Sequence, residues 1–83
     1  MSRCIHVHEL KILPKYLIDI VRGIKTFEVR FNDRNFQVGD ILMLKEFFGG
    51  EYTGREHFCR VCYILDDPAF VKEGFVILGI RER

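Results

Sequence analysis

The chain has 83 residues, 48% of them hydrophobic and 13% aromatic, which is enough apolar material for one small domain with its own core. Thirteen basic and 12 acidic residues give a net charge of +1, so overall charge recruits neither nucleic acid nor an anionic membrane. Any anion binding therefore requires a local patch. No apolar run approaches the roughly 20 residues that span a bilayer, so we expect no membrane segment and no membrane partner.

The first elements predicted are a strand followed by a helix. Residues 4–10 are rich in β-formers, and apolar and histidine side chains alternate from Ile5 to His8, which predicts the strand. Pro14 is suited to the first turn of a helix, and Gly23 to its C-terminal cap. The predicted helix carries one apolar stripe, at i, i+3, i+4 and i+7, made of Leu17, Ile20, Val21 and Ile24.

From residue 26 the hydrophobic period switches to two, which predicts a strand over 26–31 with one polar face. Its two alternating sets are Phe27, Val29 and Phe31 against Thr26, Glu28 and Arg30. Further strands are predicted at 41–48, 55–65 and 75–80, separated by turns at 32–35, 39–40 and 66–68 and by a loop at 49–54.

This order lacks a second strand–helix unit, which argues against a doubly wound sheet. It predicts an α+β fold with a five- or six-stranded, mostly antiparallel and barrel-like sheet, and one main helix between the first two strands. Residues 1–83 are expected to form a single domain.

The three cysteines, Cys4, Cys59 and Cys62, are odd in number, and no charged start precedes an apolar signal-peptide core. We therefore expect reduced thiols in a cytoplasmic protein. In a regular strand Cys59 and Cys62 would point to opposite faces, so they do not predict a metal or redox pair.

Three histidines, His6, His8 and His57, are the other candidate metal ligands. A zinc site needs three or four convergent ligands, and nothing in the spacing of these residues brings them together. We predict no metal and no cofactor, with His8 bordering a ligand cleft and His6 packed against the domain.

Lys25, Glu28 and Arg30 form the strongest candidate site, because the end of the helix places Lys25 at the mouth of a strand that displays the other two. They have two interpretations. One is a solvated strand face with an ion pair worth about 0–1 kcal/mol. The other is a functional site in which surrounding groups partly desolvate Lys25 and in which Glu28 accepts or gives a proton.

The octet Gly23-Ile24-Lys25-Thr26-Phe27-Glu28-Val29-Arg30 resembles the GxKxxExR signature of the ASCH domain, which belongs to the PUA-like superfamily of small β-barrels. The likeness covers nearly the whole chain, because residues 8–11, 32–40, 52–55 and 74–78 resemble a small single-domain ASCH group found in phages and bacteria. The resemblance implies a PUA-like pseudo-barrel with a ligand cleft beside the helix.

Many PUA-like proteins bind RNA, so the resemblance implies a non-enzymatic module for single-stranded or structured RNA, or for a nucleotide-like small molecule. Basic residues around the motif suit phosphates, and Phe36, Phe48, Tyr52 and Tyr63 are candidate stacking surfaces, although most aromatic residues of so small a domain belong to its core. The predicted ligand-binding residues are His8, Lys11, Lys25, Glu28, Arg30, Arg34, Tyr52 and Arg55.

Two alternative functions are also compatible with the sequence. Some ASCH proteins hydrolyse the amide of an acetylated cytidine, with a threonine nucleophile three positions after the motif lysine. Glu28 occupies that position here, so a hydrolase of a modified nucleoside would use Lys25 to polarise the carbonyl and Glu28 to activate water. The motif does not choose a second carboxylate among Glu46, Glu73 and Glu82. The other alternative is a protein-interaction adaptor, because some family members form parts of coregulators.

Overall fold

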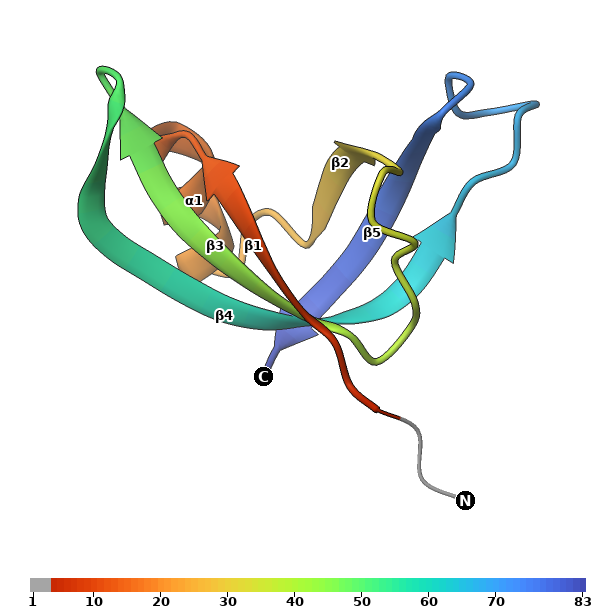
Figure 1. Cartoon of the computed structure of the whole chain (residues 1–83), viewed down its shortest axis with the longest axis horizontal. Coiled ribbons are helices and arrows are strands. Elements are labelled where there is room, and N and C mark those ends of the chain that lie inside the picture. The colour runs from red at the N-terminus through yellow and green to blue at the C-terminus, as the bar shows by residue number, and fades with distance from the viewer. Residues whose placement is uncertain (1–3) are drawn as a thin grey trace.

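Five strands and one helix make up the computed structural model, which describes residues 4–83 (Figure 1). They follow in the order β1 (Val7–Ile12), α1 (Pro14–Val21), β2 (Phe27–Phe31), β3 (Ile41–Phe48), β4 (Glu51–Leu65) and β5 (Phe75–Glu82). The predicted α+β class, the order of elements and the helix between the first two strands are confirmed. Within residues 4–83 no helix is long and apolar enough to cross a membrane.

The strands form one sheet in the order β1-β3-β4-β5-β2. β1 and β3 run parallel, and the other three neighbouring pairs are antiparallel, so the sheet is mixed. Register shifts between Lys45 and Phe47 and between Val61 and Tyr63 accompany its curvature, because bulges bend and twist a strand. Figure 1 shows the result, a half-barrel in which the long β4 crosses from one side to the other.

The inner side of the half-barrel holds the core. Its buried residues come from all strands but β2, from α1 and from the connection before β3, and they are Leu10, Ile12, Leu17, Ile20, Phe36, Leu42, Leu44, Cys59, Val61, Val76, Leu78 and Ile80. Phe36 is thus a core residue, and its prediction as a stacking surface is wrong.

The helix buries only half of its predicted stripe. Leu17 and Ile20 are buried, whereas Val21 and Ile24 are exposed. The reason is that the helix ends at Val21 and the chain turns away at Gly23, whose N–H donates to the Ile20 carbonyl oxygen at 3.0 Å. Gly23 has φ +76°, a left-handed conformation that glycine adopts without a steric cost, so its predicted role as the cap is confirmed.

Two strand boundaries differ from the predictions. β1 begins at Val7 rather than at residue 4. The predicted loop over 49–54 is wrong, because Gly49 and Gly50 alone form the turn and Phe48 pairs with Glu51. Both glycines have positive φ, 64° and 85°, which is the requirement of the tightest common hairpin turn.

The alternation predicted for β2 is present, but its orientation is unusual. Glu28 is 5% exposed, whereas Phe27, Val29 and Phe31 are 45%, 51% and 57% exposed. The register explains this arrangement, since Glu28 lies opposite Leu78 of β5, whose side chain is part of the core. β2 therefore turns its polar face toward the inside of the half-barrel and its apolar face outward.

Candidate functional site

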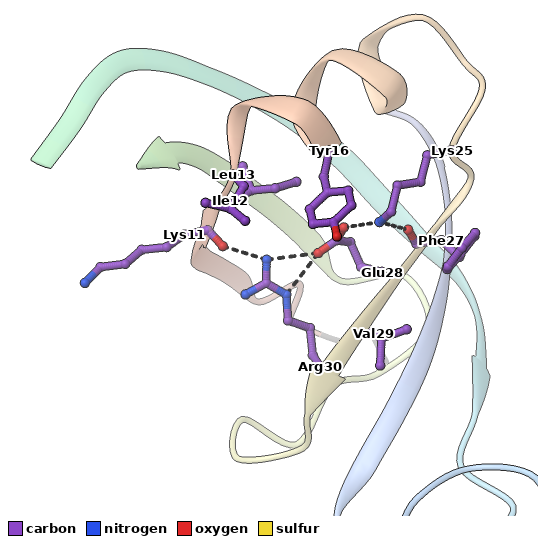
Figure 2. A pocket seen from close by; sticks show the side chains of 9 residues that line it. All are labelled: Lys11, Ile12, Leu13, Tyr16, Lys25, Phe27, Glu28, Val29 and Arg30. Atoms are coloured by element: carbon purple, nitrogen blue, oxygen red, sulfur yellow. Dashed lines mark hydrogen bonds and ion pairs between the residues drawn. The ribbon is translucent and has the colours of Figure 1, made fainter. Parts of the chain in front are cut away.

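A pocket of about 450 Å³ lies where the two edge strands of the open half-barrel approach the helix (Figure 2). Its lining comes from the end of β1, the start of α1 and β2 with the residues before it, and comprises Lys11, Ile12, Leu13, Tyr16, Lys25, Phe27, Glu28, Val29 and Arg30. The volume falls within the range of about 300–1,000 Å³ that is typical of small-molecule sites.

The Glu28 carboxylate is held between two cations in this pocket. Lys25 Nζ donates to Glu28 Oε1, and Arg30 donates from Nε at 3.0 Å and from Nη2 at 2.9 Å to Oε2. The side chains are only partly exposed: 16% for Lys25, 6% for Glu28 and 22% for Arg30. The interpretation of these residues as a solvated strand face is therefore wrong.

The gap between β1 and β2, which we term the seam, is bridged by side chains. The His6 carbonyl oxygen accepts from Ile41 N–H of β3, so by alternation the carbonyls of Glu9 and Lys11 lie on the open edge of β1. Arg34 Nη1 donates to the Glu9 oxygen at 2.8 Å and Arg30 Nη2 to the Lys11 oxygen at 2.7 Å. Arg30 thus joins the two edges of the sheet through Glu28 and Lys11.

Lys25 serves the other side of the seam. Its Nζ donates to the Phe27 carbonyl oxygen at 2.6 Å, on the edge of β2 that does not face β5. The same ammonium lies 4.8 Å from the centre of the Phe27 ring and 5.4 Å from that of Tyr16. Cation–π contacts at these distances help to hold an ammonium in a partly desolvated position.

The pocket carries a local excess of positive charge, because one carboxylate faces the cations Lys11, Lys25 and Arg30. An ammonium has three N–H donors, and two of those on Lys25 are used within residues 4–83. Arg30 uses Nε and Nη2, and no residue in that range accepts from its Nη1. The remaining donors suit a phosphate or carbonyl oxygen of a ligand.

A second group of basic and aromatic side chains adjoins the pocket through Lys11. Lys11 Nζ lies 4.4 Å from the Phe47 ring centre, and Lys45 Nζ lies 4.7 Å from that of Tyr52. The two rings meet edge to face, 5.1 Å apart. We refer to Lys11, Lys45, Phe47 and Tyr52 as the basic-aromatic patch.

Of the eight predicted ligand-binding residues, four line the pocket: Lys11, Lys25, Glu28 and Arg30. Tyr52 belongs to the basic-aromatic patch. His8, Arg34 and Arg55 lie elsewhere, although Arg34 helps to close the seam.

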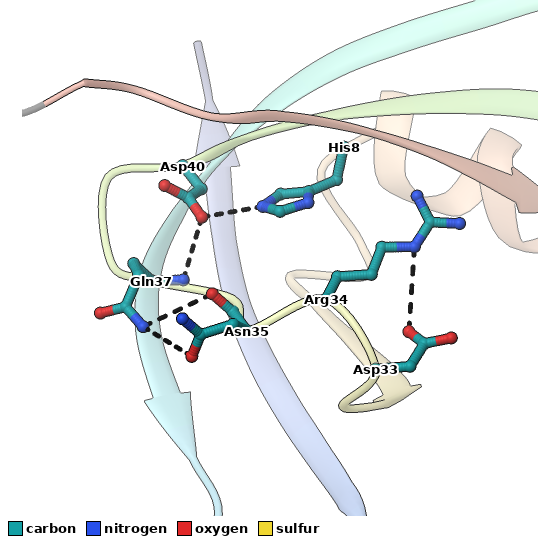
Figure 3. A network of polar contacts seen from close by, with 6 residues as sticks. All are labelled: His8, Asp33, Arg34, Asn35, Gln37 and Asp40. Carbon is teal, nitrogen blue, oxygen red and sulfur yellow. Dashed lines mark hydrogen bonds and ion pairs between the residues drawn. The ribbon is translucent and has the colours of Figure 1, made fainter.

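His8 has a structural role in the network of Figure 3. Its Nε2 lies 2.8 Å from Asp40 Oδ2, which also accepts from the Gln37 N–H at 3.0 Å, and its ring packs edge-on against Phe36 at 4.8 Å. These contacts anchor the connection before β3 to β1. The prediction that His8 borders the ligand pocket is wrong, because the ring is committed to this buried carboxylate.

Arg55 lines a different hollow, of about 1060 Å³, between α1 and the first part of β4. The buried Glu46 also lies there and accepts from Thr53 Oγ1 at 2.7 Å. Glu82 pairs with His57 at 3.1 Å, and Glu73 is exposed. None of the three candidate second carboxylates lines the pocket. Among residues 4–83, the acidic residue that lines it is Glu28.

The histidines and cysteines do not form a metal site in the described part of the chain. His6 is exposed, so the prediction that it packs is wrong, and His57 is committed to Glu82. Burial, followed by the charges of Glu28 and Glu82, raises the pKa of the Cys59 thiol from 9.0 to about 12. Cys59 therefore stays protonated at neutral pH and is a core residue rather than a nucleophile.

Sequence reasoning missed the apolar lining of the pocket, above all Tyr16. The residue lies in the first turns of α1, outside the apolar stripe, and is 41% exposed. Tyr16 is far from the charge motif in sequence, and it meets Lys25, 5.4 Å from the ring centre, only because of how the chain folds. The sequence pattern alone therefore gave no signal for it.

The fold and the site together define a small α+β half-barrel domain with a cation-rich pocket at its open seam. The chain belongs to the family described as a domain of unknown function, DUF3850, whose model matches residues 7–80. It is similar to the "Uncharacterized 12.9 kDa protein in GpA 3'region" of Escherichia phage P2, with 38% identity over 72 residues. That match covers 87% of this chain and 65% of the phage protein's length.

Proposed function

We propose that this domain is a PUA-like half-barrel of the ASCH type that binds single-stranded RNA, or a nucleotide-like ligand, in the pocket at the seam. The observation that carries the proposal is the pairing of Lys25 and Arg30 around one buried carboxylate inside a pocket with aromatic walls. The pairing holds both cations in place before a ligand arrives, which reduces the entropy that binding costs.

A nucleotide offers the groups that this pocket can bind. Tyr16 supplies a partly exposed ring face for a base, and stacking on an aromatic ring contributes about 1–3 kcal/mol per base. The spare donors of Lys25 and Arg30 suit a base carbonyl or a phosphate oxygen. The pocket therefore supplies stacking and hydrogen bonding to the same ligand unit.

The basic-aromatic patch favours a ligand longer than one nucleotide. Lys11 belongs both to the pocket and to the patch, so a strand leaving the pocket passes directly onto Lys45 and the Tyr52 ring. Lysines that neutralise phosphates, interleaved with rings, are the usual elements of a surface for single-stranded nucleic acid.

Binding is favoured over hydrolysis by the state of Glu28. Both of its oxygens already accept hydrogen bonds from cations, so a water activated by Glu28 would have to share one of them. No other carboxylate among residues 4–83 lines the pocket to act as a second acid. Glu28 therefore acts as the anchor of the two cations in this proposal.

Fluorescence anisotropy of a labelled single-stranded RNA, measured at two or more salt concentrations, tests the proposal. We expect micromolar or weaker affinity that falls with salt, with a log–log slope near −1.4 if two phosphates are neutralised. Lys11→Gln should weaken binding and reduce the slope by about 0.7, since it removes one phosphate contact. Lys72→Gln is the matched control, because Lys72 also lies over a phenylalanine ring but does not line the pocket.

No detectable binding at low salt would overturn the proposal. So would equal losses of affinity in Lys11→Gln and Lys72→Gln, because the binding would then not be localised to the seam.

A further inference from the structure

The outer face of β2, β5 and the second part of β4 is apolar and uncovered. Phe27, Val29 and Phe31 of β2 are about half exposed there, and Tyr63 of β4 is 64% exposed. Strands of a small domain normally place such residues inside and polar residues outside, and β2 does the reverse. A reversed strand indicates a face that is covered in the functional protein.

The strand register makes this face continuous. Across the three strands the rows are Phe27–Gly79–Tyr63 and Val29–Ile77–Leu65, and Phe31 lies opposite Phe75. Phe31 and Phe75 also pack edge to face, with ring centres 5.5 Å apart. We refer to these residues together as the apolar sheet face.

The area of the face matches what a dimer requires. If a fully exposed aromatic side chain presents about 200 Å², then Phe27, Phe31 and Tyr63 leave about 330 Å² exposed. Val29 and the half-buried neighbours raise the apolar area to about 450 Å². A standard interface buries about 800 Å² per partner, of which about 65%, or about 520 Å², is apolar in homodimers.

The charges at the two ends of the face are complementary to one another. Arg60 and Arg81 lie directly opposite each other on β4 and β5, both are exposed, and neither has an acidic partner among residues 4–83. Like charges in this position destabilise a sheet unless a partner compensates them. The opposite end, in the connection between the same two strands (Figure 1), carries the exposed acids Asp66, Asp67 and Glu73 against one lysine, Lys72, so it is acidic in balance.

We propose that the apolar sheet face binds a second copy of this chain, related by a two-fold axis that passes near Ile77. In that arrangement the β5 strands of the two copies run antiparallel across the interface. The arginine end of one copy then meets the acidic end of its partner, and both pairs form at once, as an isologous interface requires. The polar side of the pocket stays open, because Glu28 and Arg30 lie on the other face of β2, while Phe27 and Val29 contribute to the interface as well as to the pocket wall.

Sedimentation velocity over a concentration series tests for this dimer. We expect the wild-type chain to dimerise below about 100 μM, since interfaces of this size span micromolar to picomolar affinities. Phe31→Glu should weaken dimerisation by about a hundredfold, because the substitution places two unpaired charges in one interface. Phe48→Glu is the matched control, since Phe48 is a similarly exposed strand phenylalanine outside the face, and it should leave the association unchanged.

The orientation is tested by exchanging charges. The double variant Arg60→Glu/Arg81→Glu makes both ends acidic, and Asp66→Lys/Glu73→Lys makes both ends basic, so each should associate less than wild type by itself. Mixed in equal amounts, the two variants should recover a dimer, because their ends are then complementary. Circular dichroism melting of every variant checks that the fold is intact.

A wild-type chain that stays monomeric up to about 100 μM would overturn the proposal, as would a dimer that Phe31→Glu and Phe48→Glu affect equally. A dimer whose charge variants do not recover on mixing would refute the antiparallel arrangement.

Discussion

Replacing Glu28 by glutamine keeps its shape but removes the charge that holds Lys25 and Arg30 together. Removing one partner of a buried ion pair typically costs about 3–5 kcal/mol. The two cations are 16% and 22% exposed, so water relieves part of their repulsion, and we expect a loss of about 2–4 kcal/mol. An 83-residue domain has a free energy of unfolding of about 4–12 kcal/mol, so the loss is a large share of it.

Urea unfolding followed by circular dichroism measures this loss, and a melting temperature lower by about 8–30 °C should accompany it. Glu9→Gln is the control, because Glu9 is also a strand glutamate paired with a lysine, at 3.5 Å, but is 62% exposed. That exposed pair should contribute no more than about 1 kcal/mol. If the two variants lose stability equally, within about 0.5 kcal/mol, the buried carboxylate does not hold the seam together.

Two further predictions concern the core and the pocket wall. Because burial raises the pKa of Cys59 from 9.0 to about 12, the unfolded chain loses this proton first as the pH rises. The free energy of unfolding should therefore fall above about pH 9, by up to about 1.4 kcal/mol per pH unit. Urea titrations at pH 8 to 10.5 should show a shallower fall in Cys59→Ala than in wild type. Equal slopes in the two proteins would contradict a raised pKa of Cys59. Tyr16→Ala should weaken RNA binding by about 5- to 150-fold through lost stacking, whereas Phe48→Ala should not. If anisotropy titrations show the same loss of RNA affinity in both variants, Tyr16 is not part of the binding site.

The sequence predicted the order of elements because each local signal agreed with the final packing. Pro14 and Gly23 bound the helix region, and the alternation over 26–31 becomes β2. The loop at 49–54 was overestimated because glycine content alone does not distinguish a flexible loop from a two-residue hairpin turn. That distinction depends on the cross-strand pair Phe48–Glu51, which is not a local property.

The candidate site was predicted in its centre but not at its edges. Lys25, Glu28 and Arg30 are close in sequence, so local strand geometry was enough to bring them together. Arg34 and Arg55 carry the same charge as the pocket cations but lie elsewhere, because Arg34 follows the fold of the connection before β3 and Arg55 follows the pairing of β4 with β3. Nor did the alternation of β2 reveal which of its faces points inward, since that depends on its register with β5.

NMR shows directly whether a nucleotide ligand occupies the seam pocket. Amide chemical shifts of the ¹⁵N-labelled protein would be followed while a short single-stranded RNA is added at low salt. We predict that the shifts concentrate in two segments, residues 11–16 and 25–30, and extend to the basic-aromatic patch around Tyr52. Shifts that are absent, or that cluster away from both segments, would show that the ligand does not bind in the seam pocket.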